Sequence, residues 1–174
     1  MENDSWSIRT LNDLLDHNIR KFAVTEMQMK SVLSGWINKA ENIRLKNVLQ
    51  RYLDYVQQNK EGLDAFIEEE KLSSLNLLNK VMNAFIEDTE LKLTKCTDPE
   101  VKDACLLASV QSINHFKISL YGTAAAFAKA MGKEKAAMLF HQAEMNEKQI
   151  DESLSQLAEQ EINEKAKILA TLPA

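Results

Sequence analysis

The chain contains very few of the residues that interrupt regular structure. Only four glycines and two prolines occur among its 174 residues, whereas average usage of the two types together is about 12%. A sandwich, a barrel or a doubly wound sheet needs a turn every ten residues or so, and turns depend on Gly, Pro, Asn and Asp. The scarcity therefore excludes these folds and predicts an all-α protein with few connections.

The composition narrows the class further. With 45% hydrophobic and 27% charged residues, the chain matches an ordinary globular protein rather than a disordered one. We expect one domain over residues 1–174, with a core over about 8–170. A net charge of −5 and a pI of about 5.3 argue against a nucleic-acid partner.

The sequence also carries signals about location. No apolar run reaches the roughly 18 residues of a membrane span, and the start MENDSWSIRT is acidic and polar, unlike a signal peptide. We therefore expect a cytoplasmic protein without a membrane partner. Two cysteines, Cys96 and Cys105, do not make a disulfide framework and are interpreted as partly buried, reduced thiols.

Apolar residues recur at steps of three and four, which predicts five helices. Thr10 with Asp13 resembles a capping box at the first start. Asp98 followed by Pro99 is a strong start signal for the fourth helix, and Gly132 is placed to end it. The expected ranges are 10–40, 43–70, 74–95, 99–131 and 133–169.

Four of these helices are long, roughly 42–55 Å at about 1.5 Å per residue. The first two form one hairpin and the last two another. Residues 71–97 must connect the hairpins and carry the short helix with them. This is a ferritin-like four-helix bundle with a long crossover connection that carries a short extra helix.

Each long helix carries polar residues on its otherwise apolar stripe. Because burying unpaired charge is costly, we expect these side chains to meet at one level near the middle of the bundle. They are Glu26, Tyr52, Tyr55, Asn114, Lys117, Glu147 and Asp151. Ferritin-like proteins hold a di-iron or di-manganese site at this place, built from Glu residues and Glu-x-x-His pairs on the four helices.

The second half of the chain resembles the YciE/YciF-type ferritin-like stress proteins. The similarity is carried by Asp103-Ala104, Gln111, His115, Tyr121-Gly122-Thr123 and Glu147-Lys148, within the stretch 103–159. The first half matches more loosely, through TEMQMKSVL around Glu26, so that the similarity covers about residues 10–160. It implies a stress-related role and, by analogy, a homodimer.

The differences from the family pattern fall on the expected metal ligands. The family's E-H-Y-E is Asn114-His115-Phe116-Lys117 here, and a family histidine is replaced at Tyr52. Of the expected ligands only Glu26, Glu147 and Asp151 persist. A lysine ammonium has no lone pair to give, and at 4 Å it would repel a divalent ion by about 8 kcal/mol at an effective dielectric of 20.

We therefore expect no metal cofactor and no catalytic turnover. In this hypothesis, Lys117 takes the place of the cation between Glu26 and Glu147, with Tyr52 and Tyr55 hydroxyls completing the network. The alternative is a di-iron or di-manganese carboxylate protein of oxidase or ferroxidase type. It would need Glu26, Glu147 and Asp151 to be joined by further ligands such as Asp54 or His141.

The remaining candidates have plainer interpretations. His115 lies beside the inward stripe, which favours a structural role, and His141 with Glu144 is typical of a solvated helix face. Trp6 and the segment Ile168 to Leu172 supply spare apolar surface for dimer contact.

Overall fold

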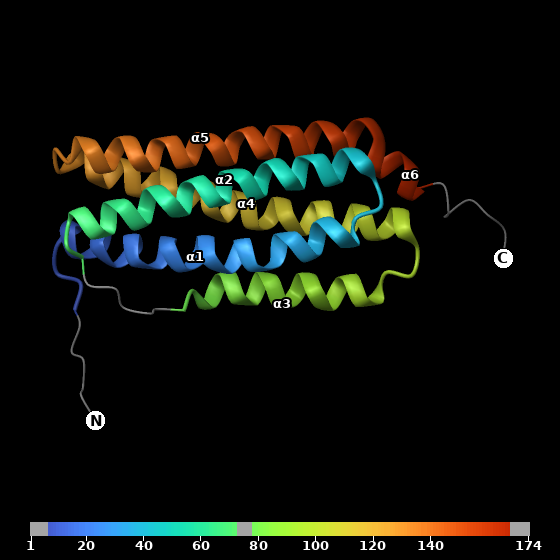
Figure 1. Cartoon of the computed structure of the whole chain (residues 1–174), viewed down its shortest axis with the longest axis horizontal. Coiled ribbons are helices and arrows are strands. Elements are labelled where there is room, and N and C mark those ends of the chain that lie inside the picture. The colour runs from blue at the N-terminus through green and yellow to red at the C-terminus, as the bar shows by residue number, and fades with distance from the viewer. Residues whose placement is uncertain (1–6, 73–77, 168–174) are drawn as a thin grey trace, which may run out of the picture.

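The computed structural model describes residues 7–72 and 78–167. Within these ranges the ordered elements are all helical, and four long helices lie along one axis (Figure 1). The helices are α1 (Leu11–Lys39), α2 (Ile43–Glu69), α3 (Lys80–Lys95), α4 (Pro99–Ala130), α5 (Glu134–Leu157) and α6 (Asn163–Lys167). None of them is long and apolar enough to cross a membrane.

The topology is that of two hairpins joined by a crossover. α1 packs against α2, α4 packs against α5, and the pairs meet through α2 with α5 and α1 with α4. The short helix α3 lies outside this core, alongside α1 and α4 (Figure 1). The expected four-helix bundle with a crossover helix is therefore confirmed.

The helix starts follow the capping signals in the sequence. Thr10 and Asp13 form a reciprocal capping box. Asp98 accepts hydrogen bonds from the N–H groups of Glu100 and Val101, ahead of Pro99 at the first helical position. Gly132 follows α4 with a φ of +68°, a left-handed conformation that glycine adopts without strain.

Two helix boundaries differ from the expectation. The crossover helix begins at Lys80 rather than 74, because Asn79 is extended and caps it by accepting from Met82 N–H. The final helix is interrupted by a π-helical turn, Ala158–Ile162, before it continues as α6. Residues 73–77 and the expected end at 169 lie outside the described residues.

Among the described residues, the core is divided into two apolar clusters along the bundle axis. The larger one, here called the turn-end cluster, lies next to the α1–α2 turn and includes Met29, Leu33, Trp36, Leu49, Tyr52, Ile113, Ile150 and Leu154. The other, the aromatic cluster, includes Leu15, Ile19, Phe22, Phe66, Tyr121, Ala124 and Phe140. Along α1, α4 and α5 the polar residues Glu26, Lys117 and Glu147 fall between the members of the two clusters.

Candidate functional site

A set of buried polar side chains separates the two apolar clusters. We call it the lysine layer, and every member is at most 1% exposed. α1, α2 and α5 each contribute one residue, and α4 contributes three. The members are Glu26, Tyr52, Asn114, Lys117, Tyr121 and Glu147.

Lys117 lies at the centre of the layer. Its Nζ is 3.0 Å from Glu26 Oε2 and 2.5 Å from Glu147 Oε1. The same atom lies 4.9 Å from the centroid of the Tyr52 ring, which adds a cation–π contact. Burial opposes the charged amine, but the carboxylates of Glu147 and Glu26 outweigh it and raise the pKa of Lys117 above its ordinary value. The side chain is therefore an ammonium ion held between two carboxyl groups.

The remaining carboxyl oxygens are engaged by neutral donors. Tyr121 donates its hydroxyl to Glu26 Oε1. Tyr52 donates to Glu147 Oε2 at 2.6 Å, and Asn114 Nδ2 donates to the same oxygen at 2.7 Å and to the Glu147 backbone carbonyl at 2.9 Å. These bonds tie α1, α2, α4 and α5 to one another at a single level.

The electrostatic balance of the layer is uneven, because two carboxyl groups face one ammonium. Burial, and then the charge of Glu147, raise the pKa of Glu26 against the opposing effects of Lys117 and Tyr121. Burial and the neighbouring carboxylates also raise the pKa of Tyr52 and of Tyr121 well above the ordinary phenol value. Both phenols thus stay protonated donors, and the raised pKa of Glu26 favours its protonated form.

The donor set of the layer does not suit a dinuclear metal centre. The point between the two carboxylates is occupied by an ammonium, which offers protons and no lone pair. Oxygen-ligated divalent ions need several carboxylates. Within residues 7–72 and 78–167, no group of three or more His, Cys, Asp or Glu side chains is placed to hold a metal ion.

Two residues expected in the layer lie outside it. The Tyr55 hydroxyl donates to Gln149 Oε1 at 2.6 Å at the surface between α2 and α5. Asp151 accepts from His115 Nε2 at 2.8 Å and from Gln111 Nε2 at 3.3 Å, between α4 and α5. Each lies one turn from a layer residue, so its side chain is rotated by about 40–60° around the helix and reaches the edge of the bundle instead of its axis.

The further ligands that the alternative required are also remote. Asp54 is bonded to Gln50 along the outside of α2. His141 is 65% exposed and pairs with Glu144 on α5, and His115 is equally exposed. Trp6 and the segment 168–172, expected to contribute to a dimer surface, lie outside the described residues.

Sequence reasoning missed some of the buried polar contacts. It did not include Tyr121 among the inward polar residues or assign its hydroxyl to Glu26, although Tyr121 lies one turn from Lys117. It also missed a buried amide pair between α2 and α5, in which Asn146 Nδ2 donates to Asn59 Oδ1 at 3.2 Å. Asn59 lies three residues after Val56 and four before Leu63, which are both inward residues of α2. This helical spacing could have predicted that the Asn59 side chain is buried.

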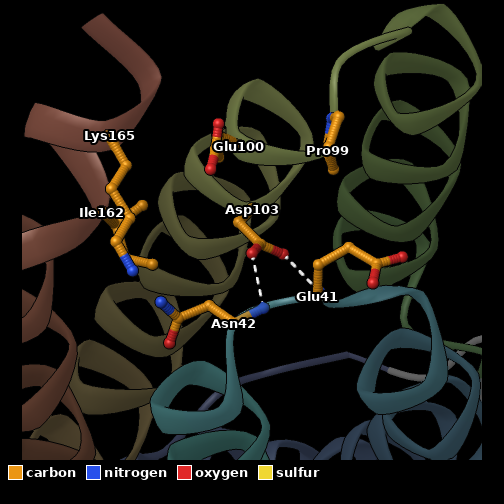
Figure 2. Close-up of a pocket in the computed structure, with 7 residues that line it drawn as sticks. All are labelled: Glu41, Asn42, Pro99, Glu100, Asp103, Ile162 and Lys165. Carbon is orange, nitrogen blue, oxygen red and sulfur yellow. Dashed lines mark hydrogen bonds between the residues drawn. The ribbon is translucent and has the colours of Figure 1, made fainter. Parts of the chain in front are cut away.

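A second polar group lies at the end of the bundle, beside a hollow of about 390 Å³ (Figure 2). Asp103 on α4 accepts from the backbone N–H groups of Glu41 at 2.9 Å and Asn42 at 2.7 Å (Figure 2). Both of its carboxylate oxygens are thus used to hold the α1–α2 turn. We assign Asp103 a structural role and find the candidate functional site in the lysine layer.

Comparison with known proteins places this chain in a family. The model for "Domain of unknown function (DUF892)" matches residues 10–167. The chain belongs to the DUF892 family. Among curated proteins it is similar to Protein YciF of Escherichia coli strain K12, with 28% identity over 161 residues, which cover 92% of this chain and 97% of that protein.

The chain is also similar to solved structures. The crystal structure of the E. coli stress protein YciF matches with a TM-score of 0.83 at 28% identity, covering 90% of this chain and 99% of that one. YcfI from Rhodopseudomonas palustris matches with a TM-score of 0.82 at 25% identity, covering 89% and 97%. The YciF-type resemblance inferred from residues 103–159 is confirmed, and this DUF892 chain shares the YciF fold.

Proposed function

We propose that this chain is a YciF-type, stress-related protein of ferritin-like architecture, whose mid-bundle site has lost its metal and serves a structural or binding role without catalytic turnover. Its relative YciF is described as a stress protein. The observation that carries the proposal is the position of Lys117 Nζ between the carboxylates of Glu26 and Glu147. A cation is still present where a dinuclear centre would have one, but it is covalently part of the protein.

The chemistry of the layer supports a non-catalytic role. Its groups are an ammonium, two phenols held in the protonated form, an amide and two carboxyl groups, and all are buried. A buried ionic network of this kind specifies how four helices align, because each charge is satisfied only in one register. In this proposal, the layer at the position of a ferritin-like redox centre serves to align the four long helices.

The proposal extends to the whole protein. One domain spans residues 1–174, the protein forms a homodimer, and it acts in the cytoplasm. The net charge of −5 favours partners other than nucleic acid.

Metal content tests the proposal directly. The protein is produced in cells supplemented with iron and manganese, purified without chelators, and analysed for metal per chain. We expect only trace metal, and no oxo-bridged iron absorption after ferrous iron and oxygen are added. Near-stoichiometric iron or manganese, or such an absorption band, would support the oxidase or ferroxidase alternative instead.

A designed variant supplies the matched comparison. Lys117→Glu with Asn114→Glu and Tyr52→His replaces the ammonium with a carboxylate and restores the ligand types of a ferritin-like site. We expect this variant to acquire metal under the conditions in which the parent protein does not. Equal metal content in the two proteins would contradict the assignment of Lys117 as the group that keeps metal out.

A further inference from the structure

The junction between α3 and α4 brings two thiols together. Cys96 is the residue that caps the end of α3, and Cys105 lies in the second turn of α4. Only Thr97 and Asp98 separate the capping residue from the start of α4 at Pro99. Both cysteines are free and only partly buried.

The register of the two helices places these cysteines at the same level. α3 and α4 are packed neighbours that run in opposite directions (Figure 1), and Phe85 and Phe116 touch across them with ring centroids 5.6 Å apart. Cys96 follows Phe85 by eleven residues, and Cys105 precedes Phe116 by eleven residues. Eleven residues make about three helical turns, roughly 16 Å, so each cysteine returns to the face that its phenylalanine occupies.

Side-chain contacts agree with this register. Burial raises the pKa of the Cys105 thiol, and its contact with the Cys96 thiol raises it further, while the nearby Lys92 ammonium opposes both effects. Cys96 Sγ donates to the Lys92 backbone carbonyl at 3.4 Å. The two sulfur atoms thus belong to one small cluster with Lys92, at the accessible edge of the turn-end cluster.

We propose that Cys96 and Cys105 form an oxidisable dithiol, which hydrogen peroxide converts into an intramolecular disulfide that joins the end of α3 to α4. The Cys96 thiolate attacks one peroxide oxygen and the O–O bond breaks. This gives the Cys96 sulfenic acid and a hydroxide, which takes the Cys96 proton as water. The Cys105 thiolate then attacks the Cys96 sulfur, the S–O bond breaks, and the departing hydroxide leaves as a second water with the Cys105 proton.

The order of the two steps follows from the environments of the thiols. Cys105 packs against the turn-end cluster, and burial disfavours its thiolate, so we expect Cys105 to react with peroxide more slowly and to act second, on the oxidised Cys96. Cys96 follows the last residue of α3 and adjoins the exposed Thr97, and we expect it to be the thiol that reacts with peroxide first. The ring that closes spans only the α3–α4 junction, so the fold does not need to rearrange.

The test uses the full reduced chain treated with hydrogen peroxide. We expect the intact mass to fall by two hydrogen atoms per chain, both thiols to resist alkylation, and dithiothreitol to reverse both effects. Trypsin cleaves after Lys95 and Lys102, so the two cysteines fall in separate peptides that stay joined only through the disulfide. Cys96→Ser and Cys105→Ser are the matched controls, and each is expected to add oxygen to its remaining sulfur instead of losing hydrogen.

Three results would overturn the proposal. The first is that both thiols can still be alkylated after peroxide treatment, in protein that keeps its helical circular dichroism. The second is that oxygen is added to both sulfur atoms of the parent chain. The third is that disulfides form only between chains.

Discussion

The buried lysine layer can be compared with a second polar cluster near the surface, which is centred on Glu161 and is here called the Glu161 cluster. The two contain the same kinds of side chain but differ in burial and in charge balance. At the end of the bundle, Glu161 accepts from Asn42 Nδ2 at 2.7 Å, Arg44 Nη1 at 2.9 Å and Lys165 Nζ at 2.7 Å. Like the layer, this cluster joins a carboxylate, a lysine and an asparagine. Unlike the layer, it is open to water and has two cations for one carboxylate.

The two carboxyl groups respond in opposite directions. Hydrogen bonds from Lys165, Asn42 and Arg44 lower the pKa of Glu161 to about 2. Burial raises the pKa of Glu26, and its single cation is shared with Glu147. Burial and the ratio of cations to carboxylates therefore decide whether the pKa of each carboxyl group is raised or lowered. We expect the stability of the protein to depend more on each member of the buried layer than on each member of the Glu161 cluster.

Removal of the cation is expected to separate the two regions most strongly. Lys117→Met keeps an unbranched side chain of similar length but leaves Glu26 and Glu147 facing each other in the core without compensation. We expect a loss of about 3–5 kcal/mol in the free energy of unfolding, measured by urea denaturation at neutral pH. The loss should shrink in acid, where protonation of Glu26 removes part of the uncompensated charge.

Two further variants test the origin of that loss. Lys165→Met removes a cation from the Glu161 cluster, and its unfolding curve is expected to stay close to that of the parent protein. Adding Glu26→Gln and Glu147→Gln to Lys117→Met removes the uncompensated charge and should recover much of the lost stability. If Lys117→Met unfolds like the parent, or if the triple variant recovers nothing, burial of charge is not what distinguishes the layer.

Tyr121 in the layer and Tyr55 outside it allow a second comparison, for which we expect an intermediate loss of stability. Tyr121→Phe keeps the ring against Phe22, whose centroid is 5.0 Å away, but removes the donor to Glu26. We expect a loss of about 1–2 kcal/mol and a further rise in the pKa of Glu26, since the Tyr121 hydrogen bond lowers it. Tyr55→Phe removes a hydroxyl that water can replace at Gln149 and should change stability by less than about 0.5 kcal/mol. Equal losses in the two variants would contradict the separation of Tyr55 from the layer.

This tyrosine pair also shows how far sequence reasoning reached. The inward stripes placed Glu26, Lys117 and Glu147 on facing helices at one level, because helical periodicity determines which residues share a face. The stripes did not separate Tyr52 from Tyr55. The two residues are three positions apart, so their side chains differ in direction by only about 60° around the helix. Which of two adjacent tyrosines enters the core is decided by the neighbouring helix.

The fold was predictable where its signals are local. The capping box at Thr10 and the start at Asp98-Pro99 need only neighbouring residues. The start of α3 at Lys80 depends on Asn79, whose side chain donates to Thr25 of α1 at 2.8 Å, a contact between distant segments. The π-helical turn Ala158–Ile162 likewise has no local sequence signal, because its sequence AEQEI contains neither the proline nor the glycine that marks most helix interruptions.

The contributions of Glu26 and Glu161 to the free energy of unfolding should change with pH in opposite directions. These are the smallest effects that we predict. The folded-state pKa of Glu26 lies above its unfolded value of about 4.5, so the folded chain binds the extra proton. Its contribution is full below pH 4.5 and is lost as pH rises through the folded pKa. Glu26→Gln imitates the protonated form, and we expect it to cost about 1 kcal/mol or less in acid while removing this decline above pH 4.5.

Glu161→Gln is the counterpart, because its pKa is lowered. The contribution of Glu161 is full above pH 4.5 and is lost as pH falls toward 2. Urea denaturation of both variants from acid to mildly alkaline pH, each compared with the parent, should change opposite limbs of the stability curve. A Glu26→Gln curve parallel to the parent at every pH above 4.5 would mean that the pKa of Glu26 is not raised by folding and that its carboxylate is ionised in the folded state. The layer would then carry a net negative charge, and the contrast with Glu161 would rest on the number of cations alone.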